Sequence, residues 1–156
     1  MDHKFNHFDE NGNAHMVDVS SKDITAREAI ATGKIYMSKE CFEMVESGSH
    51  KKGDVLTIAQ VAGILAAKKT SDMIPLTHNI QLSHVVIEFE KFEYGYIAIS
   101  KISCKGQTGA EMEALHAVTI SLLTIYDMCK AIDKRMHIED IHLISKRGGK
   151  SGDFNY

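Results

Sequence analysis

The chain has 156 residues, and its 18 lysine and arginine residues against 21 aspartate and glutamate residues give a formal net charge of −3. That charge argues against broad electrostatic binding to nucleic acid or to an anionic membrane, and a hydrophobic content of 44% is typical of a globular domain. No apolar run reaches the roughly 20 residues of a membrane-spanning helix, and segment 1–10 does not have the pattern of a signal peptide. Three cysteines without a CxxC pair predict reduced thiols and a cytoplasmic location.

The first half of the chain predicts two strands followed by two helices. We expect one domain over residues 1–156, in which 1–14 and 148–156 are flexible. Segment 16–19 is a short strand candidate, and 27–37 has the composition of a second strand. Ser38 is typical of the N-cap of a helix that ends near residue 48. In the same way, Asp54 begins a longer, uncharged helix that ends between residues 68 and 71.

The second half predicts a hairpin, a long helix and a last strand. Two alternating segments, 85–89 and 97–102, are joined by a hairpin loop at 92–95. A helix follows from about 110 to 134, and 137–145 alternates as a strand. The order of strand, helices, strand, strand, helix and strand is typical of the ferredoxin-like split βαβ arrangement. The sequence therefore predicts an α+β fold with helices packed on one face of an antiparallel sheet.

The long predicted helix has an unusual pair of charges near its end. Residues 114–126 contain no Asp, Glu, Lys or Arg, and Asp127 and Lys130 then follow at i and i+3, where their side chains can meet. Burial of two ions costs several kcal/mol for each ion, whereas an exposed pair returns only ~0.2–0.5 kcal/mol. Desolvated, coupled charges tune acids and bases, so chemistry explains the pair better than stability does. The pair shares its side of the helix with Met112, Ile120 and Leu123, which is apolar enough for a pocket wall or a subunit interface; a structural ion pair is the alternative.

Four other segments fit both a functional and a purely structural interpretation. Segment 50–54 places two lysines before a helix N-terminus, as in a phosphate grip or a solvated basic loop. His78 lies alone in a loop, where it could contact a ligand or form a surface hydrogen bond. Segment 106–113 could bind a ligand or cap a helix. The basic segment 146–150 could be a lid over an anion or a frayed tail. It is not part of a P-loop, because Ile144 stands where that motif requires glycine.

No metal or other cofactor is expected. The chain has nine histidines, but it has no HExxH motif and no Cys/His pairing with zinc spacing. A Ser/His/Asp nucleophile motif is also absent from the sequence.

Taken together, these segments resemble the cyclic pyranopterin monophosphate synthases, the accessory protein C family of molybdenum-cofactor biosynthesis. The resemblance covers nearly the whole chain at the spacing of the family. The matching segments are HMVDVS (15–20), REA (27–29), KGDV (52–55), AQVAGILAAK (59–68), IPLTH (74–78), TGAEMEAL (108–115), LTIYDMCKA (123–131) and GGKSGDF (148–154).

The resemblance implies a substrate, a reaction and an assembly. The substrate would be (8S)-3′,8-cyclo-7,8-dihydroguanosine 5′-triphosphate, and a lyase reaction would convert it to cyclic pyranopterin monophosphate and diphosphate. The family forms a homohexamer, a trimer of dimers, whose pocket lies at a subunit interface. No cofactor, nucleic acid or membrane is implied.

The resemblance also implies roles for individual residues. By matched position, Asp127 would be the active-site acid/base, and Lys52 and Lys130 would be the essential lysines. The implied substrate contacts are Leu76, Thr77, His78, Met112 and Glu113, with Arg27, Glu111 and Lys150 as further candidates. The family usually has Leu-Cys-His-Pro in the histidine loop, whereas this chain has Thr77 and Asn79. The usual thiol is therefore not available here as a nucleophile.

Two other functions compete with this interpretation. A non-catalytic ferredoxin-like module could bind a nucleotide or an amino acid and regulate another protein, in which case it would bind its ligand without turnover. RNA binding on the sheet fits the sequence poorly, because the net charge is negative and the two central strands do not have the expected aromatic pattern.

Overall fold

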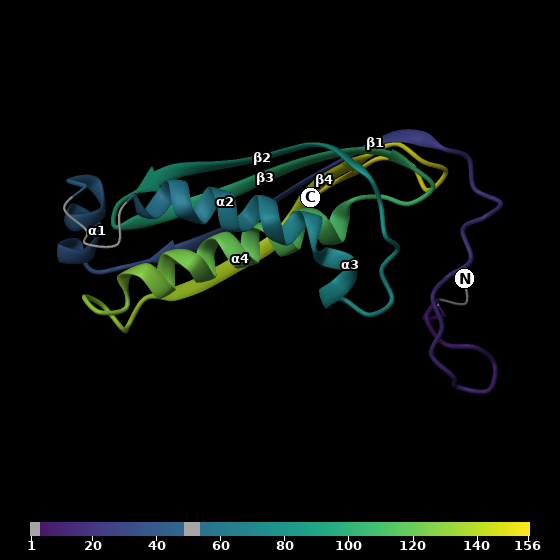
Figure 1. The fold of residues 1–156 in the computed structure, drawn as a ribbon, viewed down its shortest axis with the longest axis horizontal. Helices are drawn as coiled ribbons and strands as arrows, with labels where there is room; N and C mark the ends of the chain where they lie inside the picture. The colour runs from purple at the N-terminus through teal and green to yellow at the C-terminus, as the bar shows by residue number, and fades with distance from the viewer. Residues whose placement is uncertain (1–3, 49–53) are drawn as a thin grey trace.

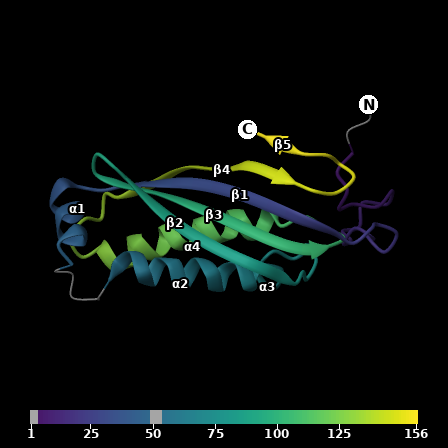
Figure 2. The ribbon, with the colours of Figure 1, turned by 90° about the horizontal axis from the view of Figure 1, so that it is seen from above.

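A computed structural model describes residues 4–48 and 54–156. Its described strands form one five-stranded sheet in the order β2-β3-β1-β4-β5. Figure 1 labels β1 to β4 of this sheet, and Figure 2 labels all five strands. All neighbouring strands are antiparallel. The strands are β1 (Thr25–Tyr36), β2 (Leu82–Phe92), β3 (Gly95–Gly106), β4 (His137–Arg147) and β5 (Phe154–Asn155).

Two long helices cover one face of this sheet. Seen from above, the strands lie in front of α2 and α4, which run side by side behind them (Figure 2). The described helices are α1 (Lys39–Glu46), α2 (Val55–Lys68), α3 (Thr70–Met73) and α4 (Glu111–Cys129). The strand order β2-β3-β1-β4, with helices after β1 and β3, confirms the predicted ferredoxin-like split βαβ fold of the α+β class. None of the helices in the described part of the chain is long and apolar enough to cross a membrane.

The core lies between the sheet and the two long helices. Ile35, Tyr96 and Ile102 of the sheet and Val118 and Leu122 of α4 are fully buried. Burial of one such side chain stabilises the fold by about 1.5–3 kcal/mol. The helices approach closely because α2 is rich in small residues, as its sequence predicts.

Close packing of the helices depends on a glycine in α2. A Cβ atom at Gly63 would lie 2.1 Å from Oγ of Ser121 in α4. That Ser121 hydroxyl donates a 3.1 Å hydrogen bond to the carbonyl of Ala59, so the polar atom is satisfied inside the interface. Any larger residue at position 63 would push α2 and α4 apart.

Local sequence signals fixed the starts of two helices. The Ser38 hydroxyl accepts a 3.2 Å hydrogen bond from the amide of Cys41, and the Asp54 carboxylate accepts a 3.1 Å hydrogen bond from the amide of Thr57. Both N-cap predictions are therefore confirmed, as is the end of α2 at Lys68. The hairpin between β2 and β3 also turns where the sequence predicts.

Two predicted elements differ from the structure. Segment 16–19 forms no strand; the Val17 carbonyl accepts a hydrogen bond from the His78 ring rather than from a neighbouring strand. The long helix ends at Cys129 instead of near residue 134. The Asp133 carboxylate accepts hydrogen bonds from the amides of Ser38 and Arg135, both at 2.8 Å, and these contacts favour a turn over further helix.

The C-terminal tail contains a strand that the sequence pattern did not indicate. β5 pairs with β4 through Asn155 opposite Ser145 and Phe154 opposite Lys146. The glycine-rich segment 148–153 is therefore a loop held at both ends, close to the start of β1. The expected flexibility of 148–156 concerns motion and stays a prediction.

Candidate active site

Several predicted site residues meet at one end of the sheet, which we call the α4 N-terminal end. It comprises the start of β1, the end of β3, the start of α4 and the end of β4, with loops 17–24, 75–81 and 148–153. Arg27 of β1 is fixed there by two backbone carbonyls. Its Nε donates to Gly106 at 3.0 Å and its Nη2 donates to Gln107 at 3.1 Å. The guanidinium is thus held in one orientation at this end of the sheet.

An ion pair joins α4 to β4 at this end. Nζ of Lys146 lies 3.0 Å from Oε1 of Glu111, and both side chains are 28% exposed. Glu111 is the first residue of α4, where a carboxylate is favoured by the helix dipole. The sequence predicts for Lys146 only a place in a basic lid or in a frayed tail. Its partner is 35 positions away, and local spacing gives no indication of such a contact.

Glu113 is the most perturbed carboxyl of the site. Its side chain is 4% exposed, and burial raises its pKa from 4.5 to about 7, with a smaller contribution from the nearby Glu111 carboxylate. A carboxyl with this pKa can hold or release a proton near neutral pH. Met112 on the adjacent position is exposed and points away from the core.

The histidine loop lies against the same end of the molecule. Nε2 of His78 is 2.6 Å from the Val17 carbonyl. A carbonyl only accepts hydrogen bonds, so Nε2 of His78 is the donor in this contact. Thr77 donates its hydroxyl to the Ile74 carbonyl at 2.8 Å, and Leu76 is half-buried. His78 lines a depression with Gly106 and Gln107, so it adjoins Arg27.

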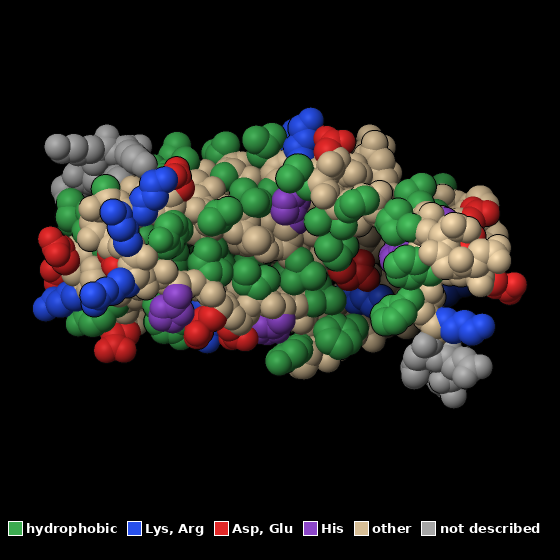
Figure 3. Space-filling view, turned by 90° about the horizontal axis from the view of Figure 1, so that it is seen from below, with side chains coloured by type: hydrophobic (Ala, Val, Ile, Leu, Met, Phe, Trp, Pro, Cys, Tyr) green, Lys and Arg blue, Asp and Glu red, His purple; other side chains and the backbone are tan. Residues whose placement is uncertain are grey.

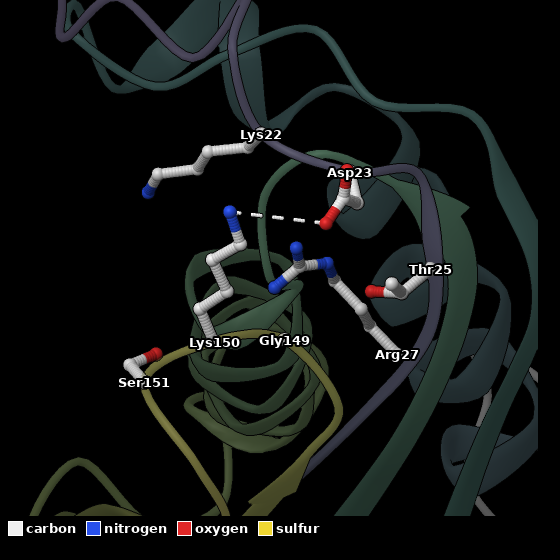
Figure 4. Close-up of a pocket in the computed structure, with 7 residues that line it drawn as sticks. All are labelled: Lys22, Asp23, Thr25, Arg27, Gly149, Lys150 and Ser151. Atoms are coloured by element: carbon white, nitrogen blue, oxygen red, sulfur yellow. Dashed lines mark ion pairs between the residues drawn. The ribbon is translucent and has the colours of Figure 1, made fainter.

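A pocket of about 560 Å³ opens beside Arg27 (Figure 4). It is lined by residues from the start of β1 and from the glycine loop: Lys22, Asp23, Thr25, Arg27, Gly149, Lys150 and Ser151. Nζ of Lys150 lies 3.8 Å from Oδ2 of Asp23, and both side chains are exposed. Three cations and one carboxylate give this pocket an excess of positive charge.

The predicted charge pair lies at the opposite end of α4. Nζ of Lys130 donates to Oδ1 of Asp127 at 2.6 Å. Their side chains are 51% and 61% exposed, respectively, so the expected desolvation of this pair is wrong for the single chain. The Asp127 carboxylate raises the pKa of Lys130, which keeps the ammonium protonated. On the outer side of α4, Leu123 is 51% exposed, so the described parts of this chain do not cover the apolar stripe beside the pair.

The site residues therefore fall into two groups. Glu113 and Asp127 are fourteen positions apart on α4, which corresponds to about 21 Å along the helix axis. The structure brings together Arg27, Glu111, Glu113, His78 and Lys150, and it leaves Asp127 and Lys130 far from them. Lys52, predicted as essential, lies outside the described residues.

Metal ligation has no support in the described part of the chain. No group of three or more His, Cys, Asp or Glu side chains there could hold a metal ion. The three cysteines are buried and form no disulfide with one another.

The fold and the site define a ferredoxin-like α+β protein whose sheet end carries a fixed guanidinium, exposed lysines and a titratable buried carboxyl. The sequence matches the MoaC family over residues 16–149. A relative from Clostridium botulinum, named cyclic pyranopterin monophosphate synthase, is 56% identical over 99% of this chain and 98% of its own length. A relative of the same name from Clostridium perfringens is 55% identical over the full length of both chains. Another, from Chloroflexus aggregans, is 52% identical over 97% of this chain and 93% of its own length. The chain belongs to the MoaC family, and it is an enzyme of that family.

Proposed function

We propose that this chain converts (8S)-3′,8-cyclo-7,8-dihydroguanosine 5′-triphosphate to cyclic pyranopterin monophosphate and diphosphate during molybdenum-cofactor biosynthesis. The observation that carries the proposal is the 56% identity, along nearly the full length of both chains, to a cyclic pyranopterin monophosphate synthase. The reaction would take place in the cytoplasm, as the reduced cysteines suggest.

The chemistry of this reaction needs cations and proton carriers. A ring must open and be rebuilt, and a cyclic phosphate must close while diphosphate leaves. Arg27 and Lys150 at the α4 N-terminal end can neutralise the phosphates, together with Lys52. Proton transfer can use Glu113, whose pKa is about 7, and the coupled pair of Asp127 and Lys130.

We further propose that one active site is built from two copies of the chain. The two groups of site residues are about 21 Å apart along α4, too far for a single small molecule to contact both groups within one chain. If a second copy brings its Asp127 and Lys130 to the α4 N-terminal end of the first, both groups can act on one substrate. A homohexamer built as a trimer of dimers would satisfy this requirement.

The outer face of the helices has the composition of a surface that a second copy would cover. Seen from the helix side, hydrophobic side chains gather over α2 and α4 (Figure 3). We call this face the helix face. About half of the surface of each of its most exposed apolar side chains is open to solvent, from 46% for Ile58 to 59% for Val61; the other two are Leu65 of α2 and Leu123 of α4. Asp127 follows Leu123 by one helical turn, so coverage of the helix face would also desolvate the charge pair.

The test of the proposed function is turnover. Purified protein would be mixed with the cyclised triphosphate, and release of diphosphate and formation of the cyclic monophosphate would be measured. We expect one diphosphate for each cyclic product. Binding of the triphosphate without release of diphosphate would instead indicate a non-catalytic binding module and contradict the proposal.

A further inference from the structure

The histidine loop begins at a short helix that is fastened to α4 by a buried hydrogen bond. α3 lies beside the first turns of α4 and leads directly into the loop (Figure 1). Oγ1 of Thr70, the first residue of α3, lies 3.0 Å from Nδ1 of His116 in α4. Thr70 is 1% exposed and His116 is half-buried, so water is largely excluded from this contact. Neither residue has a part in the chemistry proposed above.

The Thr70 hydroxyl connects three helices at one point. It donates to the carbonyls of Ala66 and Ala67 near the end of α2, at 3.0 Å and 3.2 Å. A hydroxyl has a single proton, so its oxygen accepts the remaining hydrogen bond, and Nδ1 of His116 is the donor. We call the contact between Thr70 and His116 the α3–α4 joint. Because buried polar atoms need partners, removal of the imidazole ring would weaken the attachment of α3 to α4.

A short series of hydrogen bonds leads from the α3–α4 joint to His78. The Thr70 carbonyl accepts from the amide of Ile74 at 2.9 Å, which closes the single turn of α3. The Ile74 carbonyl then accepts from Thr77 twice, from its amide at 3.2 Å and from its hydroxyl at 2.8 Å. His78 is the next residue along the chain. The backbone that carries His78 is therefore anchored, step by step, to α4.

The α3–α4 joint lies one helical turn from the buried carboxyl of the site. Glu113 precedes His116 by three positions on α4, so the two side chains leave the helix on neighbouring parts of its surface. α4 is itself held firmly, because core side chains such as Val118 are fully buried. The joint therefore relates the histidine loop to Glu113. The His78 ring has a second restraint on its other side, where it donates to the Val17 carbonyl at 2.6 Å.

We propose that His116 and Thr70 are positioning residues, which join the histidine loop to α4 and thereby set the place of His78 relative to Glu113. The inference rests on the proposed function and on the substrate contact that the family resemblance implies for His78. His116 and Thr70 act through that residue and not on the substrate itself. A shift of about 1 Å in a positioned group can lower a rate by about 10²-fold, so a joint remote from the chemistry affects turnover.

The experiment combines steady-state turnover of the cyclised triphosphate with amide hydrogen exchange in the histidine loop. His116→Leu removes the donor and keeps a side chain of similar length. We expect kcat to fall about tenfold or more and KM to change by less than about threefold, because the cations proposed to neutralise the phosphates are unaltered. The amides of Ile74 and Thr77 should exchange about tenfold faster, since their hydrogen bonds depend on the joint.

Three further variants make the test specific for the α3–α4 joint. His116→Asn places an amide N–H near the position of Nδ1 and should restore both kcat and slow exchange. Thr70→Val removes the hydroxyl and keeps the shape of the side chain, so it should act like His116→Leu. Thr119→Val is the matched control, because that hydroxyl donates to the Leu115 carbonyl at 2.8 Å within α4 and its loss should change neither measurement. The melting temperature of each variant checks that the fold is intact.

Two measurements separate failure of the inference from failure of the proposed function. Unchanged exchange of the Ile74 and Thr77 amides in His116→Leu would overturn the joint and leave the proposed function standing. Faster exchange with an unchanged kcat, or a His116→Asn protein as slow as His116→Leu, would overturn the positioning role. If the unmodified protein has no turnover and His116→Leu still accelerates exchange at these two amides, the joint is supported and the proposed function is contradicted.

Discussion

The two ends of α4 carry site residues in contrasting environments. At the N-terminal end, Glu113 is buried and Arg27 is held by two carbonyls, so these groups are positioned by the chain itself. At the C-terminal end, Asp127 and Lys130 contact each other in solvent, beside an uncovered apolar helix face. One end is preorganised, whereas the other lacks the low-dielectric surroundings that strengthen charge interactions. Under the proposed assembly, a second copy that covers the helix face would supply those surroundings to the second end.

The largest expected effect is loss of turnover when the exposed lysine is removed. An exposed ion pair contributes only about 0.2–1 kcal/mol to stability, so Lys130→Ala should leave the melting temperature nearly unchanged. If Lys130 transfers a proton in the assembled site, the rate of diphosphate release should fall by about 10²–10⁴-fold. Lys52→Ala should abolish turnover in the same assay. Full activity of either variant would remove the role proposed for that lysine.

Assembly should depend on the helix face. Val61→Asp places a charge on a side chain that is 59% exposed, so the chain should still fold. We expect light scattering to show smaller particles for this variant and activity to fall with them. Val61→Ala is the matched control and should retain the assembly. A Val61→Asp protein of unchanged size would contradict coverage of the helix face by a second copy.

The buried carboxyl should make stability depend on pH. The folded chain raises the pKa of Glu113 from 4.5 to about 7, so between these values it binds a proton that the unfolded chain has released. The free energy of unfolding therefore falls as pH rises through this window, by up to about 3 kcal/mol at pH 8.

Urea unfolding of the unmodified protein and of Glu113→Gln at pH 4.5 and pH 8 measures this contribution. The variant cannot titrate at position 113, so its free energy of unfolding should not carry this pH dependence. Between pH 4.5 and pH 8, the unmodified protein should therefore lose stability relative to the variant. If the difference in the free energy of unfolding between the two proteins does not change with pH, the pKa of Glu113 is not raised in the folded chain.

The smallest effect is expected in the histidine loop. Thr77 replaces the cysteine that is usual in the family, and its hydroxyl donates to the Ile74 carbonyl within the loop. Because this hydrogen bond is neutral and contributes about 1 kcal/mol, Thr77→Cys should change kcat/KM by no more than about fivefold. A large gain in activity would instead indicate that a thiol takes part in the reaction.

Much of the fold follows from local pattern, and most of the site does not. Alternation and caps such as Ser38 and Asp54 act over a few residues, so the strands and helix starts could be predicted. The tail strand β5 is two residues long and depends on β4 for every hydrogen bond, so it has no local signature. The end of α4 was missed for a related reason, since Asp133 binds the distant amide of Ser38.

The site could be predicted as a set of residues but not as an arrangement. Motif resemblance identified Arg27, Glu113 and His78, which the structure brings to one end of the sheet. It could not show that Glu111 pairs with Lys146, because that contact joins elements far apart in sequence. The apolar sector around Asp127 predicts a pocket wall or a subunit interface, and the sequence does not distinguish between the two. Hydrophobicity along one chain does not distinguish a core face from a face that a second copy covers.

Complementation between two inactive variants tests most directly whether each active site is shared by two copies of the chain. Arg27→Gln disables the α4 N-terminal end, and Lys130→Ala disables the opposite end. Co-expression lets the two variants assemble together, and diphosphate release is then compared with that of each variant alone. If each site is shared, it needs an intact α4 N-terminal end from a Lys130→Ala copy and an intact opposite end from an Arg27→Gln copy. Random assembly of equal amounts gives this combination in about a quarter of the sites, and these sites should be active. A mixed assembly as inactive as its parents would contradict the shared site.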